Sequence, residues 1–530
     1  MSLLLHRVRL VGAPDPGRVR DVLLEEGRVA AVVDSGDGPW GAAAEVVDAD
    51  GAWLLPGLRD EHVHLGQWAS AQHRVDLSAA SSAAEAAALL AGLPAALDPG
   101  DVLLAGGFRD GMWPAPPHRD QLDAALPGRL VVAASADLHT VWCSTPAAQR
   151  LGLRDPSGLA REAEAMEVLA RAGALDPDLL DARVLAATAA AAARGVTSVL
   201  DLEHAPLADW GRRAALPLPP GAAVGADDVP GPAVRVGAGV QVGWLDDVLA
   251  AGLRTGDPVP GASPWTAQHP VSRDRVRVGP LKVFLDGSLG ARTARCDDAY
   301  PDGTHGLLLL PAAELEQLLR RATVAGLHVA VHAIGDAAVG VALDAFEAVG
   351  CRGRVEHAQQ VRARDLPRFA ALGVVASVQP RHALDDRDLA DRYWAHGAAR
   401  SFPTGALHAA GAGLVLGSDA PVAPLDPWET LASAVHRSGD ERAAWHAEHH
   451  LTLREALTAS CGGRAFVRVG DVADLALLAE EPAEVLATRG PDGLRGIPVL
   501  GTLVGGLWTH RDAAVVAERP PVPGEPAGPV

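Results

Sequence analysis

The sequence predicts an α/β protein: a (β/α)8 TIM-like barrel with an inserted subdomain, plus a small β-sandwich domain built from both chain termini. In the centre of the chain, short apolar runs alternate with alanine-rich helical stretches. Both ends instead alternate apolar and polar residues, as the strands of an antiparallel sheet do. Alternating strands and helices predict a parallel sheet, and this many repeats favour a closed barrel over an open sheet.

The terminal domain is predicted from two segments far apart in the chain. Residues 3–33 alternate in hydropathy, and Glu26-Gly27 marks a hairpin turn. A similar strand-like pattern of apolar residues returns at 473–478 and 501–508, so the two ends are expected to share one sheet. The predicted boundaries are 1–55 with 462–515 for the β-sandwich domain, 56–461 for the barrel with 66–128 as its insertion, and 516–530 for a disordered, proline-rich tail.

The barrel strands are predicted from short apolar runs. The first strand ends in the polar run 60–64, and residues 66–128 are too many for an ordinary connection between a strand and a helix. An inserted subdomain is therefore expected there. The further strand candidates are Leu130–Ala134, Val196–Leu200, Leu281–Leu285, Val329–His332, Arg354–His357, Val374–Val378 and Gly413–Gly417.

The composition excludes several classes of function. The 530 residues carry 46 Lys+Arg against 66 Asp+Glu, a net charge of −20, which argues against a nucleic-acid or anionic-membrane partner. The four cysteines have no CxxC spacing and suit a reduced compartment. No apolar run is long enough to span a membrane or to form a signal peptide. We therefore expect a cytoplasmic protein that acts on a small molecule; the sequence is compatible with a homodimer.

Lysine is almost absent from the chain. Lys282 is its only lysine, so 45 of the 46 basic residues are arginine. Where a generic positive charge suffices, arginine has taken the place of lysine. An amine can lose its proton and act as a nucleophile, whereas a guanidinium stays protonated. Lys282 is therefore a candidate for chemistry that arginine cannot perform.

Metal-binding residue types stand at the ends of the predicted strands. In a barrel, functional side chains project from the carboxyl ends of the strands. Positions i and i+2 of a strand share a face, so His62 and His64 can converge on one metal ion. One such histidine is usually structural, but several on neighbouring strand ends indicate a metal site. The candidate ligands are His62, His64, Lys282, His332, His357 and Asp419.

The order of these residues resembles the amidohydrolase superfamily, and within it the branch called amidohydrolase family 3, which includes N-substituted formamide deformylases. Two features depart from the family pattern: Glu61 stands where the family usually has a small residue, and the link from Cys461 to Asp474 is shorter than usual. The matching segments are Pro56–Leu65, Leu138–Thr145, Lys282–Ala294, His332–Asp336, Arg354–Gln359, Ser377–His382 and Gly417–Pro421.

The resemblance implies a pair of divalent metal ions, with zinc the expected metal. His62 and His64 would bind one ion, and His332 and His357 would bind the second. Lys282, carboxylated by CO₂ to a carbamate, would bridge them. This role agrees with the lone lysine, because only an amine that can become neutral forms a carbamate.

The expected function is that of a metal-dependent hydrolase acting on non-peptide carbon–nitrogen bonds through a metal-activated hydroxide. A metal ion lowers the pKa of bound water from about 15.7 toward about 7. Asp419, also a ligand, would take the proton from that water and pass it to the leaving nitrogen. Nothing in the sequence distinguishes an amide from a formamide or a cyclic amide as the substrate.

Five further residues are candidates for substrate binding. Arg292 and His382 could orient the substrate or its oxyanion, or could pair with acids structurally. His139 and Trp142 could line the pocket or could equally have a structural role, and Trp113 could form part of a lid.

Two alternative functions account for fewer of these residues. A lyase or aldolase with a Schiff-base lysine would use Lys282 but would leave the four histidines and Asp419 without a role. A non-catalytic binding protein of the same fold would be expected to lack a metal ligand, and none is missing.

Overall fold

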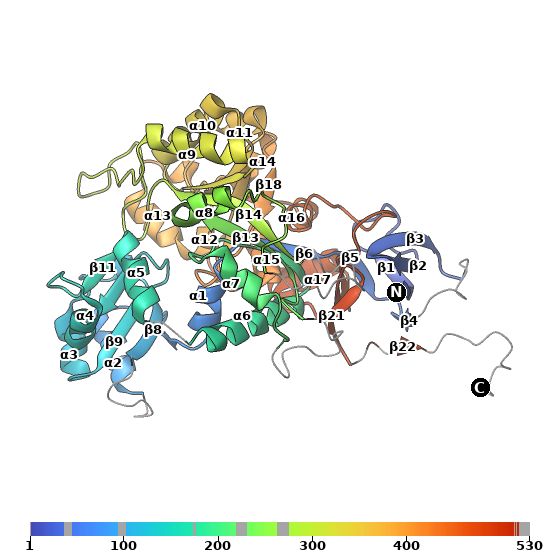
Figure 1. Ribbon diagram of the computed structural model, residues 1–530, viewed down its shortest axis with the longest axis horizontal. Helices are drawn as coiled ribbons and strands as arrows, with labels where there is room; N and C mark the ends of the chain where they lie inside the picture. Colours follow the sequence, from blue (N-terminus) through green and yellow to red (C-terminus); the bar gives the residue numbers. More distant parts are fainter. Residues whose placement is uncertain are drawn as a thin grey trace.

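The computed structural model describes residues 2–36, 45–93, 102–172, 176–218, 230–261, 275–513, 515 and 517–518. Its three sheets follow one another along the longest axis of the molecule. In Figure 1 an inserted sheet lies at the left, the barrel in the middle and a sheet containing both termini at the right. Among the described residues, no helix is long and apolar enough to cross a bilayer.

The central sheet is a closed parallel barrel of eight strands, as predicted. Each strand pairs with its neighbours in parallel. The ring closes where Val63 bridges Ala420 and the Asp419 amide donates to the His62 carbonyl at 2.7 Å. In order around the ring the strands are β6 (Leu58–Val63), β12 (Val196–Asp201), β13 (Arg235–Gln241), β14 (Val276–Phe284), β15 (Val329–Ala333), β16 (Gly353–His357), β17 (Val375–Val378) and β18 (Leu414–Leu416).

Amphipathic helices cover the barrel. Helix α9 (Ala312–Ala325) buries Leu315, Leu319 and Ala322, which lie on one face at spacings of three and four residues. It ends at Gly326, whose φ of 80° suits glycine. The other helices around the barrel are α1 (Leu65–Ala71), α6 (Pro177–Ala192), α7 (Leu207–Arg213), α8 (Leu245–Ala250), α10 (Asp336–Val349), α11 (Leu366–Leu372), α12 (Pro380–Asp385), α13 (Arg387–Tyr393), α14 (Thr404–Ala409), α15 (Pro427–His436), α16 (Leu453–Ser460) and α17 (Pro482–Arg495).

The inserted unit has its own five-stranded sheet, which extends past residue 128. The sheet has the order β11-β10-β9-β8-β7, and its own apolar core lies against α2 and α3. The strands are β7 (Val75–Asp76), β8 (Val102–Phe108), β9 (Leu130–Ser135), β10 (Thr140–Cys143) and β11 (Leu159–Arg161), with helices α2 (Ala83–Ala91), α3 (Arg119–Ala125), α4 (Thr145–Leu151) and α5 (Glu162–Ala172).

One strand expected in the barrel belongs to this insertion. The run Leu130–Ala134 forms β9, which pairs with β8 and β10 and not with any barrel strand. Its place in the barrel is taken by β13, which the sequence analysis missed. Two glycines, Gly237 and Gly239, interrupt the apolar pattern of β13. A Cβ at Gly239 would lie 2.9 Å from the side chain of Leu202, which directly follows β12, and one at Gly237 would lie 3.1 Å from that of Leu200 in β12. The close approach explains both glycines and the weak strand pattern.

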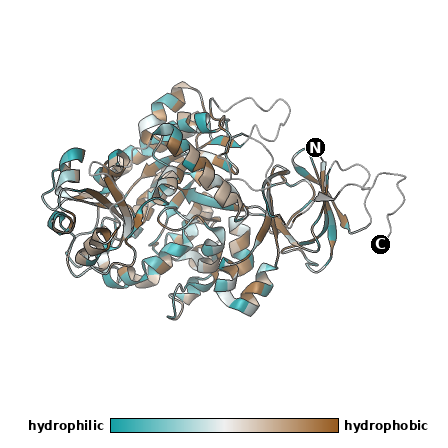
Figure 2. Cartoon of the chain, turned by 90° about the horizontal axis from the view of Figure 1, so that it is seen from below, coloured by the Kyte–Doolittle hydropathy of each residue, from teal (hydrophilic) through white to brown (hydrophobic). Residues whose placement is uncertain are grey.

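The terminal sheet joins the two ends of the chain, as predicted. Strand β5 pairs with β1 on one side and with β19 on the other, so the ladder passes from the N-terminal to the C-terminal segment. In Figure 2 the strands of this sheet are mostly brown, in keeping with their buried apolar side chains. The strands are β1 (Ser2–Leu10), β2 (Arg20–Glu25), β3 (Arg28–Asp34), β4 (Glu45–Asp48), β5 (Trp53–Pro56), β19 (Leu475–Leu478), β20 (Val499–Val504), β21 (Leu507–Arg511) and β22 (Ala517–Glu518).

The tail predicted to be disordered, 516–530, lies almost wholly outside the described residues. Only Ala517–Glu518 are described there, and they form β22, which pairs antiparallel with β4.

Candidate metal centre

The predicted metal ligands gather at the carboxyl ends of the barrel strands. His62 lies near the end of β6, His332 in β15, and His357 is the last residue of β16. Lys282 projects from β14, and Asp419 follows β18. All five residues are buried, with exposed fractions from 0% for His62 to 7% for Asp419. Buried polar side chains in such number need partners, and a metal ion would supply one.

His62, His357 and Asp419 form the tightest group. Each offers one ligand atom, and these atoms all lie within 4.8 Å of one another. The ring centroids of His62 and His357 are 4.8 Å apart, and those of His332 and His357 are 4.5 Å apart. Imidazole nitrogens and a carboxylate oxygen at these separations can ligate one ion between them.

Asp419 is the common neighbour of the histidines. Its carboxylate lies 3.3 Å from His64 Nε2 and 3.4 Å from His62 Nε2, with His382 Nε2 at 3.7 Å. The remaining buried ring nitrogen of His64, Nδ1, has no hydrogen-bond partner among the described residues. Several imidazoles around one carboxylate, with longer contacts than ordinary hydrogen bonds, fit a site that a divalent cation completes.

Burial keeps His62, His332 and His357 neutral, whereas Asp419 outweighs burial at His64 and raises its pKa. Burial lowers the pKa of His62 to about 4, and nearby Lys282 adds to the effect. Burial also holds the pKa of His332 and that of His357 well below the usual value. For Asp419, burial opposes ionisation, but His62 and the other histidines outweigh it and hold its pKa well below the usual range. Neutral imidazoles and an ionised carboxylate are the protonation states that ligate metals.

Lys282 lies inside this cluster. Its Nζ is 3.4 Å from His62 Nε2 and 4.9 Å from the centre of the Phe284 ring. Only 1% of the residue is exposed. Burial lowers the pKa of its amine to about 8, so a neutral amine is accessible near neutral pH.

Two residues that the sequence did not single out, Glu356 and Gln379, orient two of the candidate ligands. Glu356 Oε2 lies 2.7 Å from Nδ1 of His62, and Gln379 Oε1 lies 2.9 Å from Nδ1 of His357. Such partners fix the orientation of a ligating ring and direct its other nitrogen toward the metal. The sequence signal that could have identified them is their position at the strand ends: Glu356 directly precedes His357 in β16, and Gln379 follows β17.

Glu61, the departure from the family pattern, is ion-paired. Its carboxylate lies 2.9 Å from Arg354 and 3.1 Å from Arg59. Arg354 also binds Glu356, whose other oxygen contacts His62. Glu61, Arg354 and Glu356 therefore form one network next to the histidines. The charge of Glu61 is therefore compensated.

The glycine-rich segment that follows β14 is built around Asp286. Its carboxylate accepts hydrogen bonds from the amides of Ile334, Gly335 and Arg295, each at 2.9 Å. The carbonyl oxygen of Gly287 lies 3.3 Å from Nε2 of His332. This segment thereby fixes the loops on either side of β15 and holds His332 in place.

Two of the five predicted substrate residues lie at this centre. His382, on α12, stacks on His357 with ring centroids 6.1 Å apart, and its Nε2 has no hydrogen-bond partner among the described residues. His139, from the inserted sheet, lies 6.1 Å from the His332 ring. Its Nδ1 lies 2.7 Å from Glu162. Burial opposes a charge on His139, but Glu162 and Asp137 outweigh it and raise its pKa to about 9.

The other three are engaged elsewhere. Arg292 pairs with Asp302 at 3.3 Å and lies over the Tyr393 ring. Trp113 and Trp142 pack with Phe108 in the core of the inserted sheet, where they are 4% and 0% exposed. Neither tryptophan has surface left to line a pocket or form a lid. Large aromatic side chains in a loop-rich insertion serve its core, which the sequence pattern did not distinguish from a binding surface.

A cluster of histidines and an aspartate at the carboxyl ends of a closed (β/α)8 barrel defines a class of metal-dependent barrel enzymes. The chain belongs to the amidohydrolase family, in the branch numbered 3, whose model matches residues 45–509.

Relatives in sequence agree with this family. The chain is 28% identical over 448 residues to Protein LONG AFTER FAR-RED 3 of Arabidopsis thaliana, covering 78% of this chain and 74% of that protein. It is 26% identical over 422 residues to the putative amidohydrolase YtcJ of Bacillus subtilis, covering 74% and 75%. It is 27% identical over 256 residues to N-substituted formamide deformylase of Arthrobacter pascens, covering 44% and 46%.

A solved structure shows the same fold. An uncharacterized metal-dependent hydrolase from Pyrococcus furiosus superposes with a TM-score of 0.68 at 24% identity, covering 91% of this chain and all of that one. Family and relatives together support a metal-dependent hydrolase.

Proposed function

We propose that this protein hydrolyses a non-peptide carbon–nitrogen bond, such as that of an amide or formamide, with the help of one or two divalent metal ions. The observation that carries the proposal is the group formed by His62, His357 and Asp419, whose ligand atoms lie within 4.8 Å of one another. His64, His332 and Lys282 would complete the ligand set. A bound ion, which we expect to be zinc, would supply Lewis acidity and make water nucleophilic near neutral pH.

Asp419 would move the proton. Its carboxylate is ionised and faces the histidine cluster, so it can accept a proton from the attacking water. It can then deliver this proton to the nitrogen that leaves. Amine expulsion needs such a proton, because an amide anion is a poor leaving group.

Lys282 would serve as a carbamate. Its neutral amine would add to CO₂ and release one proton, and the resulting anion would offer two oxygens to the metal ions. Burial supports the first step, because it lowers the pKa of the amine to about 8. The surrounding histidines support the second, since the amine lies 3.4 Å from Nε2 of His62, within the ligand cluster.

His139 and His382 would hold the substrate. The His139 imidazolium, fixed by Glu162, would face negative charge that develops on the carbonyl oxygen. His382 would offer its unpaired Nε2 from the opposite side of His357. The relative named for formamides supports this substrate class, while the Schiff-base and non-catalytic alternatives leave the ligand cluster unexplained.

A substrate screen tests the proposal. Protein loaded with zinc would be assayed against N-formyl and N-acyl amines, before and after chelation, with Asp419→Asn as the inactive control. We expect hydrolysis that disappears on chelation and returns with metal. Turnover that is insensitive to chelation, or a borohydride-trapped adduct on Lys282, would refute the proposal.

A further inference from the structure

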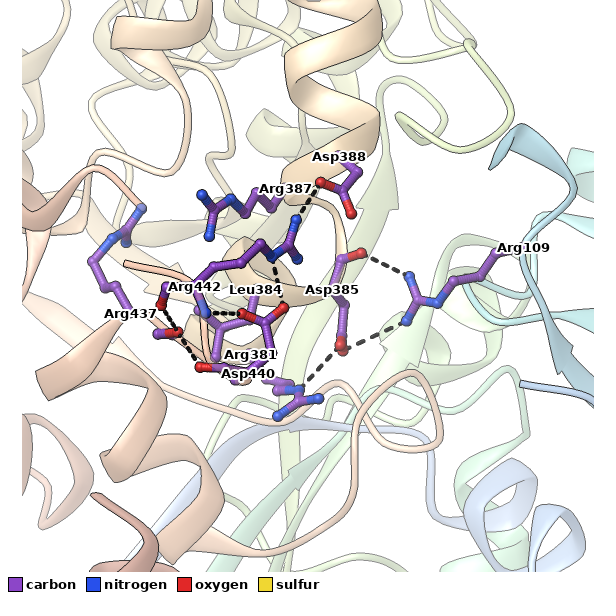
Figure 3. A pocket seen from close by; sticks show the side chains of 11 residues that line it. Arg109, Arg381, Leu384, Asp385, Arg387, Asp388, Arg437, Asp440 and Arg442 are labelled. Carbon is purple, nitrogen blue, oxygen red and sulfur yellow. Dashed lines mark hydrogen bonds and ion pairs between the residues drawn. The ribbon is translucent and has the colours of Figure 1, made fainter. Parts of the chain in front are cut away.

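A pocket lined by arginines lies between the inserted sheet and the barrel, close to the metal centre. It is accessible to water and has a volume of about 180 Å³. Its walls come from the end of β8, from α12 and α13, and from the loop after α15 (Figure 3). Helix α12 is shared with the metal centre: Arg381 lines the pocket, while the next residue, His382, faces Asp419.

The pocket gathers arginines in an acidic protein. Three aspartates line it, namely Asp385, Asp388 and Asp440, against five arginines. Asp386 and Glu429 pair with two of these arginines from beside the lining, so the five arginines share five carboxylates unequally. The five arginines are Arg109, Arg381, Arg387, Arg437 and Arg442.

Three of the five arginines have carboxylate partners. The pairs are Arg109 with Asp385 and Asp386 at 3.6 Å each, Arg381 with Asp385 at 3.1 Å and Glu429 at 2.8 Å, and Arg442 with Asp440 at 2.7 Å and Asp388 at 2.6 Å. Their charges are compensated within the protein.

Arg387 and Arg437 are different, because among the described residues neither has a carboxylate oxygen within 4.0 Å. Arg387 donates to the carbonyl of Ala443 at 3.1 Å, and Arg437 donates through Nε to the carbonyl of Trp445 at 2.9 Å. Arg437 is only 2% exposed, and its buried Nη2 has no hydrogen-bond partner within the part of the chain that the structure describes. In Figure 3 the guanidinium of Arg387 lies between those of Arg437 and Arg442. A buried guanidinium without an acid is costly unless an anion compensates it.

We propose that this pocket binds a small oxyanion, a carboxylate or a phosphate group, through Arg387 and Arg437. The planar guanidinium forks match the oxygens of either group. The anion would give Arg387 and Arg437 the charged partner that neither has among the described residues. Two sources fit this chemistry: a free anion, or a carboxylate carried by the substrate itself.

Calorimetric titration of the metal-loaded, full-length protein with inorganic phosphate tests the binding. We expect saturable binding that Arg437→Gln and Arg387→Gln each weaken about tenfold or more. The matched control, Arg320→Gln, removes the same charge from an exposed pair with Glu316 on α9 and should leave binding unchanged. Arg387 is only half-buried, so its variant keeps the test decisive if Arg437→Gln does not fold.

Phosphate can also bind metal ions, so the titration is repeated after the metal has been chelated and the chelator removed. Binding that persists and still depends on Arg387 belongs to this pocket. The proposal is overturned if the wild type shows no saturable binding, or if both arginine variants bind phosphate as tightly as the wild type.

Kinetics separate the two sources of the anion. Only this kinetic experiment rests on the proposed hydrolase activity. If no activity is found, the result of the phosphate titration still stands. If phosphate raises KM of the wild type at unchanged kcat, and has no such effect on Arg387→Gln, the pocket holds a carboxylate of the substrate. A change of kcat at saturating substrate that Arg387→Gln abolishes assigns it to a free anion.

Discussion

His332 of the barrel and His139 of the inserted sheet lie with ring centroids 6.1 Å apart, yet their environments drive them to different protonation states, neutral for His332 and cationic for His139. Burial, with Lys282 nearby, holds the pKa of His332 well below its usual value. His139 is also buried, but Glu162 and Asp137 raise its pKa to about 9. The barrel therefore provides neutral nitrogens that can ligate a metal, and the insertion provides a cation at the edge of the same site.

The two units also hold their residues by different means. The candidate ligands Lys282, His332 and His357 stand on parallel strands whose backbone ladder fixes their spacing. His139 is fixed by side chains: Glu162 accepts from the hydroxyl of Thr293, and Asp137 accepts from that of Ser288 at 2.8 Å. Both hydroxyls belong to the segment after β14, so these contacts tie the insertion to the metal centre.

The largest effect is expected for Lys282→Arg. Arginine cannot form a carbamate, and it places a fixed cation among the candidate ligands. Two unit positive charges about 4 Å apart repel each other by roughly 4 kcal/mol at a dielectric constant of 20, so the guanidinium would disfavour a bound metal ion. We expect loss of metal and of all measurable hydrolysis, by elemental analysis and by assay.

The comparison variant Lys282→Ala leaves a space instead of a charge. Added acetate or propionate should partly restore its activity, and should not restore that of Lys282→Arg. A bare amine on Lys282 beside a fully occupied metal site, seen in a crystal structure, would contradict the carbamate.

Asp419→Asn should separate proton transfer from metal binding. The amide keeps the shape of the side chain but cannot accept the proton, so kcat should fall about 10²–10⁴-fold. Metal content, measured on the same preparation, should be largely retained. An Asn variant with near-normal kcat would remove Asp419 from the role of base.

His139→Gln tests the cation from the insertion. We expect kcat/KM to fall about tenfold to a hundredfold through the loss of a charged hydrogen bond, with metal content unchanged. His328→Gln, an exposed histidine at the other end of β15, is the control and should behave as the wild type. Loss of metal from His139→Gln would show that the inserted sheet contributes a ligand rather than a charge.

The smallest effect concerns the pH dependence of stability in metal-free protein. The folded pKa of His139, about 9, exceeds its ordinary value of 6.5. Its contribution to the free energy of unfolding is therefore complete below pH 6.5 and is lost as the pH rises to about 9. Glu162→Gln removes the largest of these partners and should reduce this decline, which denaturant unfolding at a series of pH values would detect. An unchanged decline in the variant would assign it to another group.

The sequence predicted the barrel, and the gathering of the candidate ligands at its strand ends, better than it predicted the insertion. Strand ends in a barrel meet by necessity, so spacing along the chain sufficed to bring His62, His357 and Asp419 together. No such rule relates β9 to its neighbours, and Leu130–Ala134 was assigned to the barrel because an apolar strand looks alike in either sheet.

Partners that act through one hydrogen bond were equally hard to foresee. Glu356 and Gln379 acquire their roles only when three strands close around His62 and His357. The sequence pattern around Trp113 and Trp142 did not show whether they line a pocket or pack inside the insertion. They pack inside it, because an insertion needs aromatic side chains for its own core. The pairing of arginines around α12 depends likewise on which acids the fold brings near.

The most direct test of the central claim is the metal content of the purified protein and of the double variant His62→Ala/His64→Ala. We predict one to two equivalents of a transition metal per chain in the wild type, measured by elemental analysis. The double variant should lose most of it while keeping its fold by circular dichroism. A folded double variant with unchanged metal content would contradict the assignment of this cluster as the metal centre.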